Sequence, residues 1–394
     1  MFLSGLVIAL LPGERGAAVQ ESAPTIPDRV AEYSQLTGNV SSSPPGRGIA
    51  LFQFGFGVEF LDFPQAVVVG ADGDVYRRVD LAEDAAGRTS QGDPGPMLLS
   101  PDGTRVAVGN YDTDRPAVAV VDLASGRVDR HAVQAGRGVL PLAWSPDGRR
   151  LAYLGTPEPW NPQGDGPIAG NVRVLDLETG RTAALPAGSD VHTVAFAPDG
   201  SELAVQHTDG ALEVLSLDGE GGRDLPLSAD HRLAGPAAWS PDGALVAIRR
   251  SGGSVAFVDA TGRSGDTPDP LDPRVVSPGH VLGWTAPDRV AVLVADPVGD
   301  AGPDQHTVLD VPLDGADPRR LSAISTSEGR YGVGQFQLAA GLLPDLEVRE
   351  AGDVDRGRWP LWLRLAAALA AGAAAAGAAG LVRRRLRPRG AASP

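Results

Sequence analysis

Short segments in which apolar and polar residues alternate recur through the middle of this 394-residue chain. The sequences RVAVGN at 105–110 and RLAYLG at 150–155 are two of them. Alternation with a period of two is typical of β-strands that are buried on one side. Turns rich in proline, aspartate and glycine separate these segments, so the pattern predicts antiparallel strands joined by short connections and an all-β fold.

One tetrapeptide punctuates the strands at a steady interval. Ser100-Pro101-Asp102-Gly103 recurs from Ser145, Ala197 and Ser240, with a degenerate copy from Ala286. The aspartates of successive copies are 45, 52, 43 and 46 residues apart. Proline presets φ for the second turn position, aspartate bonds its own backbone, and glycine closes the turn without steric cost. We therefore assign a structural turn role to Asp102, Asp147, Asp199 and Asp242.

Each repeat supplies a strand, the SPDG turn, a strand, a loop, a strand, a second glycine turn and a strand. A lone four-stranded meander cannot bury both of its faces, so copies must stack, and radial stacking gives a β-propeller. Residues 48–92 contain a plausible unit without SPDG, and five marked units follow it. The remaining strand-like residues 326–352 either close the ring or pair with the lead-in as a composite seventh blade. We expect a six-bladed propeller over 48–352, with seven blades as the alternative.

The pattern W/F-S-P-D-G followed by V-x-D-x-x-x-G-R resembles the WD40-like repeats of the TolB-type β-propeller family, over about residues 95–325. This resemblance implies the propeller fold. It implies less about activity, because the family includes secreted scaffolds, partner-binding modules and non-catalytic propellers of some peptidases. The chain differs from TolB in having no recognisable extra N-terminal domain and in its expected membrane anchor. TolB's partners are therefore not carried over, and we interpret the chain as a membrane-anchored bacterial member.

Both ends of the chain carry apolar segments. Residues 361–382 contain a single charge, Arg364, and as a helix would extend roughly 33 Å, which is enough to cross a bilayer. Five arginines in the tail, 383–394, predict that the tail is cytoplasmic and that the propeller lies outside the cell. Residues 353–360 are expected to form a linker and 13–47 a loosely structured lead-in rich in Gly, Ser and Pro. Residues 1–12 are interpreted as part of a signal or anchor segment, so the protein would cross the membrane once, or twice if that segment is a second anchor.

The charge balance excludes one class of partner. The chain has 34 basic and 49 acidic residues, and six of the arginines lie after residue 360, which leaves 28 basic against 49 acidic residues before it, a balance of −21. An acidic surface repels the phosphate backbone, so we expect no nucleic-acid binding. Absence of cysteine excludes disulfides and thiolate metal sites.

The sequence offers few ingredients for catalysis. No two of the six histidines have metal-site spacing, and neither a GxSxG elbow nor a Walker sequence is present. His192 and His280 fall at the start of predicted innermost strands, where a channel would expose them, although packing explains them more simply. We expect a non-enzymatic protein without cofactor or metal; a propeller hydrolase or lactonase with a metal in its channel is the alternative.

Three loops between the second and third strands of a repeat are long, at 109–117, 155–170 and 295–306. In a four-stranded meander these loops emerge together on the face opposite the SPDG turns. The candidate binding face comprises Tyr111, Asp112, Asp114, Trp160, Asp165, Asp296, Asp300 and Asp304. Aromatic anchors among polar residues are typical of binding surfaces, whereas acidic loops are also common as plain solvated connections. We predict a module that binds an unknown protein or cell-envelope ligand there.

Overall fold

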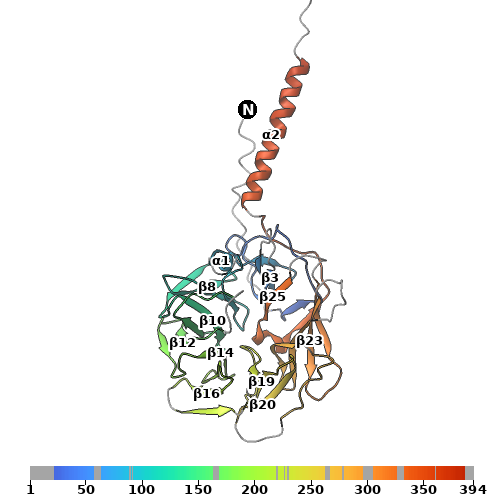
Figure 1. Cartoon of the computed structure of the whole chain (residues 1–394). Helices are drawn as coiled ribbons and strands as arrows, with labels where there is room; N and C mark the ends of the chain where they lie inside the picture. Colours follow the sequence, from blue (N-terminus) through green and yellow to red (C-terminus); the bar gives the residue numbers. More distant parts are fainter. Residues whose placement is uncertain are drawn as a thin grey trace, which may run out of the picture.

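Six sheets of mainly antiparallel strands are arranged in a ring (Figure 1). The computed structural model describes residues 22–56, 64–87, 90, 92–162, 168–218, 221–225, 227–228, 230–261, 267–276, 279–295, 305–325, 332–359 and 361–386. Each sheet is one blade, and consecutive repeats of the sequence form consecutive blades. The expected β-propeller fold is confirmed, with six blades.

The first three blades each contain four strands, which follow one another from the channel outward. Blade 1 contains β25 (Gly332–Leu338), β3 (Gly48–Phe56), β4 (Gln65–Gly70) and β5 (Tyr76–Arg78). Blade 2 contains β6 (Met97–Leu99), β7 (Arg105–Val108), β8 (Ala117–Asp122) and β9 (Val128–Ala132). Blade 3 contains β10 (Gly138–Trp144), β11 (Arg150–Thr156), β12 (Asn171–Asp176) and β13 (Thr182–Ala184).

The second half of the ring repeats this plan with two variations. Blade 4 contains β14 (Val191–Phe196), β15 (Glu202–His207), β16 (Leu212–Ser216) and β17 (Gly222–Leu225). Blade 5 has three strands among the described residues: β18 (Arg232–Leu233), β19 (Leu245–Arg249) and β20 (Val255–Asp259). Blade 6 contains β21 (Gly279–Ala286), β22 (Arg289–Ala295), β23 (Gln305–Pro312) and β24 (Arg319–Ser325), with β2 (Arg29–Val30) added at its outer edge.

The ring is closed by a strand from the end of the repeat region. Strand β25 pairs antiparallel with β3, so residues from the two ends of the propeller share blade 1. The leftover segment after blade 6 therefore supplies the innermost strand of the first blade, and the composite seventh blade does not form. Closure of this kind pairs the backbone groups that an open inner edge would expose.

The lead-in and the segment before the last helix are fixed to the propeller. Strand β1 (Thr25–Pro27) pairs parallel with β26 (Glu347–Arg349), and β2 pairs parallel with β24. Farther along, the buried guanidinium of Arg77 donates to the carbonyl oxygens of Ser43 and Asp355 at 2.7 Å each, and to the Asp355 carboxylate at 2.8 Å. The segment interpreted as a loose lead-in is thus held on blade 6 through β2 and on blade 1 through Ser43, and Asp355 of the expected linker is held on blade 1.

Apolar side chains between neighbouring blades form the core. The three repeated tryptophans occupy one register position of blades 3, 5 and 6, and each is at least 93% buried. Their indole N–H groups donate across to the preceding blade: Trp144 to the carbonyl of Leu98 at 3.2 Å, Trp239 to that of Ala195 at 3.1 Å and Trp284 to that of Ala238 at 3.2 Å. The prediction that these tryptophans form inter-blade core is confirmed, and the hydrogen bonds add a directional contact to the packing.

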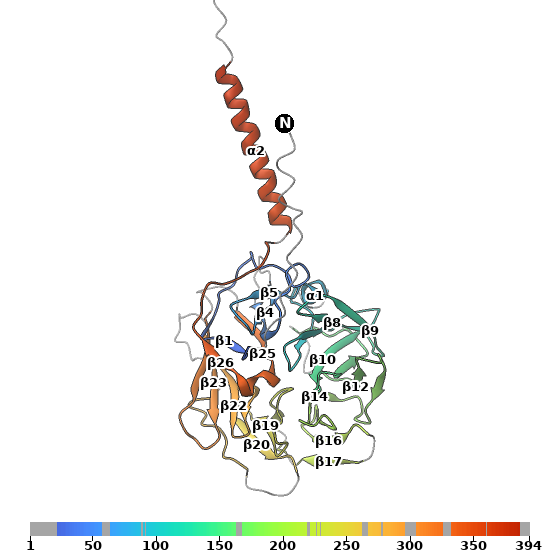
Figure 2. The same ribbon diagram turned by 180° about the vertical axis from the view of Figure 1, so that it is seen from behind.

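Three helical elements accompany the sheets among the described residues. Helix α1 (Asp80–Asp84) follows blade 1, and the 3-10 helix η2 (Ala340–Asp345) follows β25. Helix α2 (Leu361–Leu386) points away from the ring in both views (Figures 1 and 2). Within the part of the chain that the structure describes, no helix combines the length and the apolar character that crossing a membrane requires. The structure therefore does not support the transmembrane helix predicted at 361–382, a segment built mainly of alanine and interrupted by Arg364 and three glycines.

Candidate binding face

The propeller has two unlike faces. Each innermost strand from blade 2 to blade 4 runs toward an SPDG-type turn, so the connections between second and third strands emerge on the opposite side. We call this side the long-loop face. Its described connections include residues 109–116 of blade 2, and residues 157–162 and 168–170 from one loop of blade 3. The first residues of the innermost strands surround the channel mouth on the same face.

Tyr111 and Trp160, the predicted aromatic anchors, pack on each other. Their ring centroids are 5.5 Å apart with an interplanar angle of 52°. The backbone N–H of Trp160 donates to the backbone carbonyl of Tyr111 at 3.0 Å. Only 3% of Tyr111 is exposed, and both residues join the hydrophobic core that runs into blades 3 and 4. The pair therefore fastens the loop of blade 2 to that of blade 3, and its aromatic surface is largely used in doing so.

Tyr111 also contacts a strained residue at the channel mouth. Burial raises the pKa of Tyr111 to about 12, and a hydrogen bond with the Gln335 side chain opposes this rise only in part. Gln335 has φ of +51°, the only positive value among the non-glycine residues that the structure describes. This backbone conformation costs about 1–2 kcal/mol. It places the Gln335 amide where its Nε2 donates to Oε1 of the fully buried Gln53 at 3.2 Å.

The acidic residues of the blade 2 loop are tied to an arginine from blade 3. The Arg137 guanidinium donates two hydrogen bonds to the Asp112 carboxylate and lies 3.3 Å from that of Asp114. The Asp112 hydrogen bond raises the pKa of Arg137, with smaller contributions from the charges of both aspartates. The Asp112 carboxylate is thus neutralised within the protein, whereas the Asp114 side chain is 86% exposed and available to a ligand.

Four other predicted members of the face, Asp165, Asp296, Asp300 and Asp304, lie outside the described residues. The structure therefore brings together four of the eight predicted residues, Tyr111, Asp112, Asp114 and Trp160, at the junction of blades 2 and 3.

His192 and His280 occupy the second position of β14 and β21, at the channel mouth of the long-loop face. The Nδ1 atom of His192 lies 3.0 Å from the Ile168 carbonyl oxygen, which fixes that ring to the blade 3 loop. His280 is exposed and its Nδ1 lies 3.3 Å from the Arg249 guanidinium. His280 was recognisable from the sequence but Arg249 was not, because only the register of blade 5 brings the two together.

A third histidine of this face lies between two carboxylates. His207 Nδ1 is 3.0 Å from Asp190 Oδ1, and its Nε2 is 2.9 Å from Glu213 Oε1. Partial burial alone would lower the pKa of His207, but the hydrogen bonds to Asp190 and Glu213 outweigh burial and raise the pKa. His207 therefore links the inner edge of blade 4 to its third strand, and protonation of the ring strengthens both contacts.

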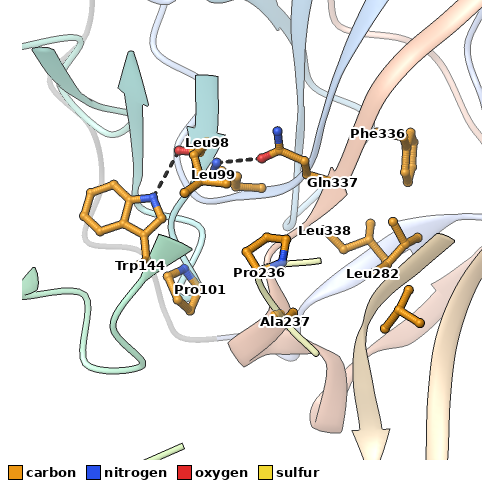
Figure 3. A pocket seen from close by; sticks show the side chains of 12 residues that line it. Leu98, Leu99, Pro101, Trp144, Pro236, Ala237, Leu282, Phe336, Gln337 and Leu338 are labelled. Atoms are coloured by element: carbon orange, nitrogen blue, oxygen red, sulfur yellow. Dashed lines mark hydrogen bonds between the residues drawn. The ribbon is translucent and has the colours of Figure 1, made fainter. Parts of the chain in front are cut away.

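The channel interior beneath the mouth is mainly apolar. A cavity of about 100 Å³ is lined by Leu98, Trp144, Leu282, Phe336, Gln337, Leu338 and further apolar residues (Figure 3). Gln337 supplies its polar atoms to the wall, since its Oε1 accepts from the Leu99 N–H and its Nε2 donates to the Met97 carbonyl, both at 2.9 Å.

Helix η2 lies at the opposite, SPDG end of the channel. The Gly341 N–H donates to the carbonyl of Pro101 in blade 2, and Leu343 packs against Gly283 in blade 6. These contacts join the two blades that flank blade 1.

The repeated aspartates are engaged within their own turns. Asp102 Oδ1 accepts from the Ser100 hydroxyl at 2.6 Å and from the Thr104 N–H at 3.0 Å. Burial acts to raise its pKa, but these hydrogen bonds outweigh burial and lower the pKa. The carboxylates of Asp147 and Asp242 accept the corresponding hydrogen bonds in their turns, whereas Asp199, which follows Ala197, accepts from the backbone N–H and the hydroxyl of Ser201. Within the described ranges, no group of three or more His, Asp or Glu residues is placed to hold a metal ion.

Comparison with known proteins gives no match to a family model and none to a curated protein sequence. Among solved structures, the chain is similar to TolB from Acinetobacter baumannii, at 16% identity over 75% of this chain and 68% of that one, with a TM-score of 0.49. It is also similar to the β-propeller domain of Cps50 (Swd1) from Myceliophteria thermophila, at 16% identity over 58% and 71% of the two chains, with a TM-score of 0.40. The hydrazine synthase of Kuenenia stuttgartiensis matches at 20% identity over 60% and 68% of the two chains, also with a TM-score of 0.40.

Proposed function

We propose that this protein is a non-catalytic binding module whose six-bladed propeller holds a protein or cell-envelope ligand on its long-loop face. The observation that carries this proposal is the fixed junction between blades 2 and 3. Tyr111 and Trp160 lock two loops together by packing, and Arg137 anchors Asp112 across the same junction. Loops that are already ordered lose less conformational entropy when a ligand binds, so a pre-formed surface favours recognition.

The chemistry of the channel agrees with binding. Its described lining is made of leucine, valine, proline and aromatic side chains around one glutamine whose amide is already bonded to the wall. Such a lining supports packing and shape recognition more readily than acid–base or hydrolytic steps, which need titratable groups near the reacting atoms.

We propose further that exposed apolar side chains at α2 attach the propeller to a membrane, with the propeller outside the cell. Leu365 and Leu369 on α2 are 56% and 76% exposed, and Trp359 just before the helix is 52% exposed. Apolar side chains exposed in this way favour insertion into lipid or contact with another helix. Separation of lysed cells into membranes and soluble protein tests the attachment, and protease treatment of intact cells tests the orientation. A propeller found in the soluble fraction, or one protected in intact cells, would contradict this part of the proposal.

The binding role is tested by affinity capture with a loop variant. The full-length chain is immobilised and mixed with cell-envelope extract, beside a variant in which residues 161–167 are replaced by a short Gly-Ser linker that keeps Trp160. A matched control is Arg149→Ala, because Arg149 is exposed in an SPDG turn on the other face. We expect the wild type and the control to retain the same partner and the loop variant to lose it. Equal retention by all three would show that the long-loop face is not the binding surface.

A further inference from the structure

Positive and neutral donor groups gather on one part of the long-loop face, between blades 5 and 6. Arg232 on β18 and Arg249 on β19 are direct cross-strand partners in the register of blade 5. Residues directly opposite each other on neighbouring strands point to the same side of the sheet, with Cβ atoms about 4.5–5.5 Å apart, and like charges in such pairs are destabilising. The register thus places two positive charges side by side at the channel mouth of a propeller whose overall balance is strongly acidic.

Arg249 extends this pair to blade 6. One of its guanidinium nitrogens lies 3.3 Å from Nδ1 of His280, which is the second residue of β21. In the part of the chain that the structure describes, the Arg249 guanidinium forms no ion pair with a carboxylate. At the channel mouth, the Arg249 guanidinium therefore contacts a histidine and not an acidic side chain.

The hydrogen bond determines which proton His280 carries. A guanidinium can only donate, so Nδ1 of His280 must accept, and the proton of the neutral ring lies on Nε2. Desolvation first, and then the charges of Arg249 and His306, lower the pKa of His280, which keeps the ring neutral at pH 7. Arg249 and His280 consequently offer N–H donors to a ligand at the mouth. Arg232, which donates through Nη1 to the His231 carbonyl at 2.8 Å, adds its positive charge beside them.

We propose that Arg232, Arg249 and His280, the blade 5–6 donor cluster, form a binding site for an anionic group, a carboxylate or a phosphate, at the channel mouth. An anion supplies oxygen acceptors to these donors, and it screens the repulsion between the two arginines. Charge-assisted hydrogen bonds from guanidinium groups to carboxylate or phosphate are the strong class of such contacts. His280 is exposed at the rim, so a solvent-borne anion can reach the cluster.

This inference goes beyond the proposed partner binding and does not depend on it, because the site can be probed with small anions. The full-length chain is titrated with inorganic phosphate and, separately, with succinate, while the imidazole signals are followed by NMR. The His280 signal is assigned from its loss in His280→Gln. We expect the His280 resonances to shift in a saturable manner, and the probe with the lower dissociation constant indicates which anion class the site prefers.

Two arginine variants provide the specificity control. Arg249→Gln removes the contact to His280, whereas Arg250→Gln removes the next, exposed arginine of the same segment. Loss of a charge-assisted hydrogen bond predicts affinity weaker by about tenfold or more for Arg249→Gln, with little change for Arg250→Gln. Arg249→Lys, which keeps the charge, should retain part of the affinity and serves if the glutamine variant fails to fold. Absence of any saturable shift in the wild type, or equal weakening by both glutamine variants, would overturn the proposal.

Discussion

Replacing Trp239 tests how the blades are held together. Its side chain is 7% exposed within the core shared by blades 4, 5 and 6, and its indole N–H donates to the Ala195 carbonyl at 3.1 Å. Two substitutions separate packing from hydrogen bonding. Trp239→Ala removes both contributions, whereas Trp239→Phe keeps much of the aromatic surface and removes the donor.

The expected magnitudes follow from these two contributions. Truncation of a buried tryptophan to alanine costs about 3–5 kcal/mol, because apolar contacts are lost and a cavity remains. The phenylalanine variant removes the hydrogen bond from the indole to the Ala195 carbonyl, and a single hydrogen bond of this kind contributes about 0.5–1.5 kcal/mol. Trp239→Phe should therefore destabilise the protein by a fraction of the alanine value.

Urea unfolding followed by circular dichroism measures both effects, with Trp359→Ala as the matched control. Trp359 lies before α2 and is 52% exposed, so its replacement should change the free energy of unfolding by less than about 0.5 kcal/mol. If Trp239→Phe is as stable as the wild type, the inter-blade hydrogen bond contributes nothing. If Trp239→Ala costs no more than Trp359→Ala, the account of the inter-blade core is wrong.

Three further predictions concern a turn, a titrating side chain and the contacts by which Arg77 holds Ser43 and Asp355 on blade 1. Gly103→Ala and Gly46→Ala both place a side chain at positive φ, at a cost of about 1–2 kcal/mol. At Gly103 the new Cβ would also lie 2.0 Å from a backbone carbonyl oxygen, whereas at Gly46 it would meet no atom within 4 Å. The urea midpoint should therefore fall further for Gly103→Ala, and equal midpoints would contradict the reasoning. Because the folded-state pKa of His207 is raised, its contribution to stability is fully present below the unfolded value of about 6.5 and is lost as pH rises through the folded pKa. Unfolding midpoints should decline over that pH range in the wild type and decline less in His207→Gln. Parallel profiles for the two proteins would exclude His207 as the cause. Arg77→Ala should cost roughly 2–3 kcal/mol, because the guanidinium of this 4% exposed residue donates to several carbonyl oxygens. Asp355→Asn should cost less than about 1 kcal/mol, because the aspartate side chain is 57% exposed. Similar losses in thermal unfolding would show that the ion pair with Asp355, and not the carbonyl contacts, holds these segments on blade 1.

Much of the fold was predictable because each repeat carries its own local signals. The SPDG turns and the alternating strands specify the meander, and the steady spacing of Asp102, Asp147, Asp199 and Asp242 shows that the unit repeats. The closing strand was harder to assign. Residues 332–338 carry no repeat signature, and only their pairing with β3, at the far end of the propeller sequence, shows that they complete blade 1.

The candidate site was less predictable, because its chemistry depends on contacts between blades. Tyr111 and Trp160 are recognisable as aromatic loop residues, but sequence spacing cannot show that they pack on each other and leave little aromatic surface free. The pairing of Arg232 with Arg249 depends on the register of the short strand β18, which spans two residues and has no periodic signal to detect.

Site-specific photo-crosslinking in native membranes tests the central claim most directly. A photoreactive amino acid is placed at Asp114, which is 86% exposed on the long-loop face, and in a second chain at Arg149, which is 70% exposed on the SPDG face. Binding through the long-loop face predicts a discrete cross-linked partner from position 114 and none from position 149. The same partner from position 149 alone, or from both positions equally, would contradict the account.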